Sequence, residues 1–358
     1  MNSNFDAMKL AVESANPNNT VLFDDRGLPS IMVRIPKFKI SDVIEGGTDD
    51  IHPAFIVDGV EKDEIFISKY QNIVVEDRAY SLAMQDPKTY INFDTAKKVC
   101  ENKGKGWHLM TNAEWAAIAL WCKKNNMMPR GNNNYGCDHS YRHEHGTVTY
   151  TYQDSGKKYN GRTATGSGPV SWSHDGTNGG IFDLNGNVWE WTSGMRLKDG
   201  EIQILPNNNA AVTGRSQTAE STLWKAIKKD GTLVEPGTAG TLKYDYETTP
   251  AVGGKIKLVE TLAHKQPTEE AYAYQTFETL TAVSGITVPQ IMKALALAPI
   301  DGQCGADYLW MRNIGERLPL RGGSWLHSSD AGVFALYLAF TRANSYPHVG
   351  FRSAFCVQ

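Results

Sequence analysis

Residues 318–325 read Leu-Pro-Leu-Arg-Gly-Gly-Ser-Trp, and they open a C-terminal region of unusual pattern. Two more stiff blocks follow, Ala-Gly-Val-Phe-Ala-Leu at 331–336 and Val-Gly-Phe-Arg at 349–352. Short stretches of unrelated side chains lie between or just before these blocks, at 326–330, 337–340 and 344–348. This pattern is typical of a rigid scaffold with interchangeable contact positions. It favours binding over catalysis.

The overall composition is that of a folded globular protein. Of the 358 residues, 41% are apolar and 21% are charged, which is enough for one large domain or two smaller ones. The net charge of −3 provides no basic field for a phosphate backbone, so we expect no nucleic-acid partner. No run of eighteen apolar residues occurs, and the sequence therefore predicts no membrane-spanning helix.

The N-terminus and the cysteines indicate where the chain is made. Residues 1–6 lack a charged segment followed by an apolar one, so no secretory signal is predicted. The five cysteines are scattered and odd in number, which is typical of thiols in a reducing compartment. We therefore expect synthesis in the cytoplasm without a signal peptide, and a role outside a cell would need another route of export.

Local patterns predict short elements joined by irregular backbone. Thr111 followed by Glu114 is a capping-box signature, which predicts the start of a helix. An earlier helix is predicted with Asp94 as its N-cap. Because the chain also contains 33 glycines and 9 tryptophans, we expect an α+β fold with much loop, braced by aromatic packing.

Six blocks, in order along the chain, carry a resemblance to a known family. They are Phe-Ile-Ser-Lys-Tyr at 66–70, Asn-Phe-Asp-Thr-Ala at 92–96, Trp-His-Leu-Met-Thr-Asn-Ala-Glu-Trp at 107–115, Gly-Ile-Phe-Asp-Leu-Asn-Gly-Asn-Val-Trp-Glu-Trp-Thr-Ser at 180–193, Arg-Gly-Gly-Ser-Trp at 321–325 and Gly-Phe-Arg-Ser-Ala at 350–354. Together they resemble the formylglycine-generating-enzyme (sulfatase-modifying factor) type of C-type lectin fold.

The resemblance implies a division of the chain. Residues 1–50 lie outside the blocks and would form an N-terminal arm or small subdomain. Residues 51–358 would form the C-type lectin-like domain, interrupted by an insertion at about 196–315. The C-terminal blocks would then return to the domain after this insertion.

The resemblance also bears on catalysis. The formylglycine-generating enzymes oxidise a substrate cysteine, and the resemblance places their two active cysteines at His327 and Gly332 of this chain. Neither residue can supply a thiolate nucleophile or a soft copper ligand. Moving the chemistry to Cys304 or Cys356 would break the family's geometry. We therefore expect no catalytic residues, and an oxidase-type enzyme of this fold with a rearranged active site is the alternative.

The C-terminal region is similar to that of a second group with this fold, the variable proteins of diversity-generating retroelements, which include phage receptor-binding tail proteins. In that group, template adenines are copied unfaithfully, so Asn-type codons become almost any codon ending in a pyrimidine. Such codons cannot encode Lys, Glu, Gln, Met or Trp, and none of these occurs in the three stretches. The resemblance implies a variable region at 321–352.

The predicted ligand-contacting residues come from the three stretches. Leu338 is assigned to the scaffold, because it shares a strand face with Leu336 while Tyr337 and Ala339 share the other face. Phe340 would fall on the buried face under strict alternation, and a core phenylalanine is the alternative for it. The predicted contact residues are Leu326, His327, Ser328, Ser329, Asp330, Tyr337, Ala339, Phe340, Asn344, Tyr346, Pro347 and His348.

These side chains suit a binding surface. Tyr337, Tyr346, His327 and His348 offer large amphipathic contacts with few rotatable bonds, and contacts on a rigid scaffold lose little order on binding. We therefore predict a non-enzymatic, hypervariable ligand-binding protein of a phage or prophage, on the virion tail or carried to a cell surface by another route. Its partner would be a protein or glycan on a host or target cell, without membrane insertion, and the sequence leaves an oligomer open.

One block resembles a calcium-binding segment of the formylglycine-generating enzymes, although the binding role itself requires no cofactor. By that match Asp183 and Glu190 would offer carboxylates, and Gly186 and Val188 backbone carbonyls, which suits the hard Ca²⁺ ion. The alternative is that Glu190 hydrogen-bonds to backbone in a buried turn. A second cluster fits no familiar zinc spacing; its members are Cys137, His139, His143 and His145.

Overall fold

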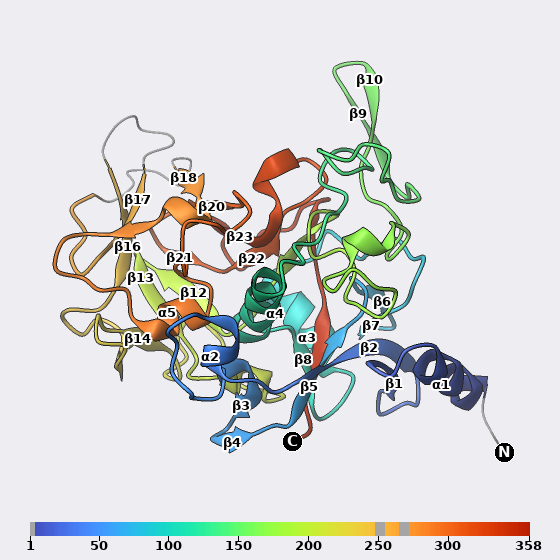
Figure 1. The fold of residues 1–358 in the computed structure, drawn as a ribbon, viewed down its shortest axis with the longest axis horizontal. Helices are drawn as coiled ribbons and strands as arrows, with labels where there is room; N and C mark the ends of the chain where they lie inside the picture. The colour runs from blue at the N-terminus through green and yellow to red at the C-terminus, as the bar shows by residue number, and fades with distance from the viewer. Residues whose placement is uncertain (1–3, 248–254, 265–271) are drawn as a thin grey trace.

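The computed structural model describes residues 4–247, 255–264 and 272–358 (Figure 1). Most of its regular structure consists of short strands joined by loops, which is the predicted α+β fold with much irregular backbone. None of the helices in the described ranges is long and apolar enough to cross a membrane. The helices are α1 (Asn4–Ala15), α2 (Ile40–Val43), α3 (Phe93–Glu101), α4 (Asn112–Lys124) and α5 (Gln290–Ala294).

The starts of α3 and α4 test the predicted caps. The Thr111 hydroxyl accepts from the Glu114 N–H at 3.1 Å, and the Glu114 carboxylate accepts from the Thr111 N–H at 2.9 Å, so the capping box of α4 is confirmed. The prediction of Asp94 as the cap of α3 is wrong, because Asn92 Oδ1 accepts from the Thr95 N–H at 2.9 Å instead. Asn and Asp cap helices equally well, and Asp94 lies in the first turn, where its charge suits the helix dipole.

One sheet joins the two ends of the chain. Its order places β25, near the C-terminus, between β5 and β8, with the N-terminal strands on the far side of β5. β2 pairs antiparallel with β5, so the boundary predicted near residue 50 separates two strands that hydrogen-bond to each other. The five strands are β1 (Asn19–Phe23), β2 (Pro29–Pro36), β5 (Glu64–Ser68), β25 (Ser353–Phe355) and β8 (Trp107–Leu109).

A six-stranded sheet carries the C-terminal blocks. β23 pairs antiparallel with β22 and parallel with β20, so a strand from the predicted insertion lies directly beside the predicted variable region. Trp310 on β20 is the register partner of Tyr337 on β23. In sheet order the strands are β18 (Ala273–Thr276), β20 (Tyr308–Met311), β23 (Gly332–Leu338), β22 (Leu320–Gly322), β11 (Trp189–Trp191) and β24 (Val349–Phe351).

The remaining strands form an eight-stranded sheet and three two-stranded ribbons. The larger sheet contains β12 (Met195–Lys198), β13 (Glu201–Ile204), β14 (Lys225–Ile227), β15 (Leu233–Val234), β16 (Lys243–Tyr246), β17 (Ile256–Val259), β19 (Thr281–Ala282) and β21 (Glu316–Arg317). The ribbons are β3 (Ile56–Val57) with β4 (Val60–Glu61), β6 (Ile73–Val75) with β7 (Arg78–Tyr80), and β9 (Thr151–Asp154) with β10 (Lys157–Asn160), the last projecting from the body (Figure 1).

Two buried arginines hold the C-terminal blocks in place. Arg352 pairs with both carboxylate oxygens of Glu190 at 2.7 Å and donates to the Phe182 carbonyl at 2.9 Å. Arg321 donates to Asn112 Oδ1 at 2.7 Å, and burial lowers the pKa of its guanidinium to about 9. Because buried charges need such partners, these arginines belong to the scaffold.

Candidate ligand-binding face

The three stretches that are predicted to vary meet through aromatic rings. The Tyr337 ring centroid lies 4.8 Å from that of Phe340, which stacks on Tyr346 at 4.9 Å. Tyr346 in turn stacks on His348 at 5.5 Å. We use "aromatic face" for these four rings and the neighbouring His327. The face therefore unites residues from all three stretches.

Two tryptophans from neighbouring strands form the floor of the aromatic face. Trp189 on β11 lies 5.0 Å from the ring of His327 and 5.6 Å from that of Tyr337. Trp310 on β20 lies 5.6 Å and 5.8 Å from the same two rings. Because both tryptophans are buried in the sheet, the aromatic face stands on a rigid base.

Most of the predicted contact residues reach the surface. Leu326 is 39% exposed and Tyr346 38%, and Ser328 and Ser329 in the 3₁₀ turn Ser328–Asp330 are also exposed. Seven others are partly buried: His327, Asp330, Tyr337, Phe340, Asn344, Pro347 and His348. Eleven of the twelve predicted contact residues are thus at least partly open to a ligand.

Two positions at the end of β23 depart from simple alternation. Ala339 is only 1% exposed, so its placement on the outward face with Tyr337 is corrected. The strand ends at Leu338, and the alternation of side chains does not continue beyond it. Phe340 is partly exposed and packs between Tyr337 and Tyr346, so it belongs to the aromatic face and not to the core. Leu338 is fully buried, as assigned.

Residues outside the stretches hold them through main-chain atoms. Such bonds do not depend on which side chain a stretch carries at that position. Such bonds run from the Ser328 N–H to the Asn133 carbonyl at 2.8 Å, from the Tyr90 N–H to the Tyr346 carbonyl at 3.0 Å, from the Leu318 N–H to the Phe340 carbonyl at 3.0 Å, from Arg162 Nη1 to the Pro347 carbonyl at 3.0 Å and from the Trp189 N–H to the His348 carbonyl at 2.8 Å. The main chain of the stretches is therefore held in place by bonds that do not involve their side chains.

Two predicted contact residues also have local roles. Asn344 Oδ1 accepts from the N–H and the hydroxyl of Thr341, at 2.7 and 3.0 Å, and so closes a turn. His327 Nε2 accepts from Trp189 Nε1 at 3.4 Å, which leaves Nδ1 to donate to the Ser324 hydroxyl at 3.0 Å. These side chains shape the face as well as forming part of it.

The aromatic face is electrically neutral at pH 7. Burial, helped by the nearby His348, lowers the pKa of His327 to about 3. Burial lowers the pKa of His348 to about 4 and raises that of Tyr337 to about 12. Among the twelve predicted contact residues, only Asp330 is of a type that carries a charge at this pH. The surface therefore offers rings, hydroxyls and amides, with little net field.

Comparison with known families gives the chain its place. The model of the sulfatase-modifying factor enzyme 1-like domain matches residues 15–234, which is more than half of the chain. The chain belongs to this family. Its fold is the C-type lectin-like fold of the family, and the match begins just before β1, in agreement with the pairing of the N-terminal strands in the main sheet. No curated protein matches the sequence.

Several solved structures are similar to this member of the family. PvdO from Pseudomonas aeruginosa is 14% identical, with 94% of this chain and 98% of that chain covered and a TM-score of 0.38. Treponema denticola variable protein 1 is 11% identical, with 95% and 99% covered and a TM-score of 0.33. The Major Tropism Determinant P3c variant is 11% identical, with 94% and 71% covered and a TM-score of 0.30. We draw no functional argument from likenesses this distant.

The two positions to which the resemblance assigns the family's active cysteines carry a histidine and a glycine, and both are packed against neighbouring groups. His327 is engaged at both ring nitrogens, as described above. At Gly332 a Cβ atom would lie 2.1 Å from Asp307 Oδ1, so the carboxyl of Asp307 fills the space that a side chain would need. Asp307 is held there by the Phe334 N–H at 2.7 Å, and burial holds its pKa well above the usual range. Burial also raises the pKa of the Cys304 thiol to about 12, so it stays protonated at neutral pH.

The four candidate calcium ligands do not fit a calcium ion. Both oxygens of Glu190 are paired with Arg352, whose positive charge would repel a cation. Gln71 Nε2 donates to Glu190 Oε1 at 2.9 Å, to the Val188 carbonyl at 3.1 Å and to the Asp183 carbonyl at 3.2 Å. The amide and the guanidinium therefore occupy the Glu190 carboxylate and the Val188 carbonyl, while the Asp183 carboxylate accepts from the Gly166 N–H at 2.9 Å. Gly186 serves instead as a tight turn, where a Cβ would lie 2.2 Å from the Asn132 carbonyl oxygen.

The candidate zinc ligands are also not gathered into a site. Within residues 4–247, 255–264 and 272–358, no group of three or more His, Cys, Asp or Glu side chains is placed to hold a metal ion. Cys137 instead bonds to the Asn134 carbonyl, and His145 Nδ1 to the His143 carbonyl. This segment is a loop closed by its own polar groups.

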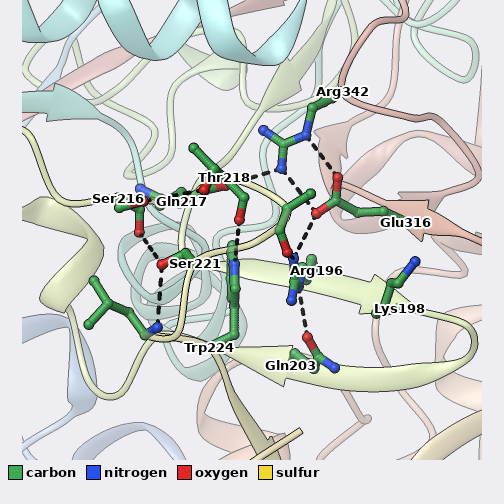
Figure 2. A network of polar contacts seen from close by, with 12 residues as sticks. Arg196, Lys198, Gln203, Ser216, Gln217, Thr218, Ser221, Trp224, Glu316 and Arg342 are labelled. Carbon is green, nitrogen blue, oxygen red and sulfur yellow. Dashed lines mark hydrogen bonds and ion pairs between the residues drawn. The ribbon is translucent and has the colours of Figure 1, made fainter.

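A partly buried ionic network ties Arg342, in the predicted variable region, to the predicted insertion (Figure 2). Arg342 pairs with Glu316 at 2.8 and 3.0 Å, and Arg196 reaches the same carboxylate at 2.9 Å. Burial opposes ionisation of Glu316, but the two guanidinium groups outweigh it and hold its pKa below the usual range. Arg196 also donates to Gln203 on β13 at 2.7 Å. The loop after β23 is thus fixed to the large sheet.

Sequence reasoning missed several aromatic residues that extend the face. Tyr308, next to Trp310 with ring centroids 5.4 Å apart, lies 6.3 Å from Tyr274 on β18. On the other side, Trp325 lies 6.2 Å from His348 and 5.9 Å from Tyr150 near the β9–β10 ribbon. The aromatic pair Tyr308 and Trp310, at positions i and i+2 in β20, is a sequence signal for such a surface. Their position beside the variable stretches has no such signal.

Proposed function

We propose that this family member is a non-enzymatic ligand-binding protein that presents exchangeable side chains on a C-type lectin scaffold. The main observation behind the proposal is that the three stretches are held by bonds to their main-chain atoms. Scaffold residues bind the main-chain atoms of the stretches, while the aromatic side chains of the stretches gather into one face. A surface built in this way accepts new side chains without losing its anchors.

The chemistry of the aromatic face supports recognition of a partner surface. Tyrosine and tryptophan rings are enriched at the energetic centres of interfaces, because they bury much area with few rotatable bonds. Since the floor is rigid and the anchors are fixed, little conformational entropy is lost on binding. The partner would be a protein or glycan on a host or target cell, contacted by a phage or prophage protein on the tail of a virion or on a cell surface.

An oxidase-type enzyme is the second candidate, because the family resemblance includes the formylglycine-generating enzymes. This type of enzyme would need two cysteines, which the resemblance assigns to His327 and Gly332. The His327 ring is engaged at both nitrogens, and at Gly332 the Asp307 carboxyl fills the space that a side chain would need. The test is direct: purified protein is given a cysteine-containing peptide and copper, and oxygen consumption is followed. Turnover of the peptide would overturn the non-enzymatic proposal, and no consumption above a heat-denatured control is expected.

The diversification proposal has its own genetic test. The DNA around the gene is sequenced and searched for a near-copy of the segment that encodes Arg321–Arg352, beside a reverse-transcriptase gene. We expect the two copies to differ mainly where the near-copy has adenines, at codons of the predicted contact residues. A gene without such a copy, or differences spread evenly over scaffold codons such as that of Trp325, would contradict the proposal.

A further inference from the structure

The aromatic face continues on both sides into rings that belong to other strands. On one side it passes from Trp310 through Tyr308, both on β20, to Tyr274 on β18. On the other side it passes through Trp325 to Tyr150, next to the β9–β10 ribbon. β18 and the ribbon lie on opposite sides of β23 (Figure 1). The rings therefore cross the molecule from one side of the aromatic face to the other.

The ribbon contributes a row of tyrosines. Tyr152 on β9 and Tyr159 on β10 are register partners, with ring centroids 5.6 Å apart, and all the other side chains of the two strands are polar. Tyr150 lies 6.3 Å from Tyr152, and Tyr135 lies 5.5 Å from Tyr159. We use "aromatic file" for the whole series from Tyr274 to Tyr135, in which each ring centroid lies no more than 6.3 Å from the next.

Both ends and the middle of the aromatic file have an exposed tyrosine. Tyr274 is 37% exposed, Tyr346 38% and Tyr135 38%. Tyr135 also has a φ of 54°, which is uncommon for a bulky side chain, and its N–H donates to the Trp325 carbonyl at 2.9 Å. Strained backbone of this kind is concentrated at functional sites, where the surrounding structure holds it. Tyr274 and Tyr135 lie outside the predicted variable region, so the two ends of the aromatic file are fixed.

A series of similar rings suits a ligand that repeats. Protein partners bind most strongly through a few central residues, which weaker contacts surround. In the aromatic file the rings instead follow one another from end to end. Successive units of a polymer can each stack on one ring of such a series, as the bases of single-stranded nucleic acids stack on aromatic side chains. A nucleic acid would in addition need a groove of cations along its backbone.

The charges beside the aromatic file do not form such a groove. Arg162, which packs on the Tyr150 ring at 4.2 Å, is paired with Asp86 at 2.8 Å. The strands of the ribbon carry two lysines and one aspartate, and the whole chain has a net charge of −3. The rings are uncharged at pH 7, since burial raises the pKa of Tyr152 to about 12 and lowers that of His348 to about 4. A neutral series of rings favours an uncharged polymer.

On the basis of the proposed display function, we propose that the aromatic file binds an extended, uncharged polysaccharide. The C–H faces of the sugar rings stack on successive tyrosines, and the sugar hydroxyls exchange hydrogen bonds with the phenol groups. The fixed rings at both ends contact the repeating backbone of the polysaccharide. The exchangeable residues in the middle distinguish one polysaccharide from another.

The test is affinity electrophoresis in native gels that contain dextran, galactomannan, xyloglucan, arabinoxylan or mixed-linkage β-glucan. At least one of these neutral polysaccharides is expected to retard the protein, because the fixed rings contact the backbone whichever residues the stretches carry. Tyr274→Thr, Tyr135→Asn and Tyr346→Ser are each expected to weaken that binding about three- to tenfold, as for the loss of one stacked ring. Thermal melting checks that the variants fold. Tyr141→Ala is the matched control, because Tyr141 is 46% exposed, packs on Arg130 and lies outside the aromatic file.

Three results would overturn the proposal. Retardation by none of the polysaccharides would exclude an uncharged glycan, and it would leave the display scaffold itself to the genetic test. Unchanged binding in both Tyr274→Thr and Tyr135→Asn would show that the ligand does not extend along the aromatic file. A gel shift with oligothymidylate that is stronger than any retardation by a polysaccharide would assign the rings to single-stranded nucleic acid.

Discussion

At the scale of single residues, the C-terminal region contains two kinds of position. Arg352 is fully buried, and its charge is neutralised only by Glu190. Tyr346 is 38% exposed, and the scaffold holds it through its carbonyl oxygen. The first kind supports the fold, and under the proposed function the second is free to vary. Substitutions at the two kinds should therefore differ sharply in cost.

The buried pair gives the first prediction. Arg352→Met leaves the Glu190 carboxylate buried without a counter-ion, which should lower the free energy of unfolding by about 3–5 kcal/mol. Tyr346→Ser, only six positions away, should cost less than about 1 kcal/mol because its anchor is the main chain. Urea denaturation followed by circular dichroism measures both. Similar losses in the two variants would contradict the division into scaffold and display positions.

The buried histidines give a prediction about pH. The pKa of His327 is lowered to about 3 and that of His348 to about 4. Because the ordinary histidine pKa is about 6.5, the folded state binds fewer protons than the unfolded state once the pH falls below this value. Their contribution to stability is present above pH 6.5 and is lost as the pH falls toward 4. The variant His327→Asn/His348→Asn should lose less stability than the parent over this interval. A parallel pH profile for the two proteins would show that the histidines stay accessible to protons.

At the scale of elements, the loop 344–348 depends on anchors from distant segments. Arg162 donates to the Pro347 carbonyl, pairs with Asp86 at 2.8 Å and packs on the Tyr150 ring at 4.2 Å. None of these contacts requires a particular side chain in the loop. The main chain of a loop held in this way stays ordered when side chains of the loop are exchanged.

Removal of that anchor should loosen the loop alone. Arg162→Ala is expected to speed amide hydrogen exchange at residues 345–349 and to leave exchange in α4 unchanged, because the core is not touched. Arg26→Ala is a suitable control, since its pair with Glu76 is exposed and far from the loop in sequence. Uniformly faster exchange throughout the chain would instead mean that Arg162 supports the whole fold.

The space around Gly332, the first residue of β23, determines whether a cysteine can be placed at this position. A cysteine at Gly332 must displace the Asp307 carboxyl, and overpacking of this kind costs about 1–3 kcal/mol. We expect His327→Cys/Gly332→Cys to be destabilised and to consume no oxygen with a cysteine peptide. A stable double variant with oxidase activity would show that the site is a dormant enzyme centre.

Some elements could be predicted from sequence and others could not. The capping box at Thr111 and Glu114 is local, and it formed as predicted. The cap of α3 was misassigned because Asn92 and Asp94 carry equivalent caps two residues apart. Ala339 was placed outward by alternation that ends with the strand at Leu338. Such errors arise at the ends of elements, where local rules compete.

At the scale of the whole molecule, six ordered blocks were enough to predict the fold, and the first four of them lie within residues 15–234, which the family model matches. The pairing of β2 with β5 and the position of Trp310 beneath the aromatic face follow from tertiary contacts that no local pattern contains. The same holds for Gln71, whose amide donates to the Val188 carbonyl and the Glu190 carboxylate, two of the groups that the calcium prediction assigned to an ion. Long-range packing therefore determines the features that the local sequence pattern does not predict.

The most direct test of the central claim is a library in which the exposed or partly exposed contact positions are randomised with pyrimidine-ending codons. Folding is measured for each member by resistance of the displayed protein to protease. We predict that most members with changes at positions such as Ser328, Tyr346 and His348 fold as well as the parent. A matched library at scaffold positions such as Trp189, Trp325 and Arg352 should fold rarely. If the two libraries tolerate substitution equally poorly, the C-terminal region is an ordinary core segment and the display surface does not exist.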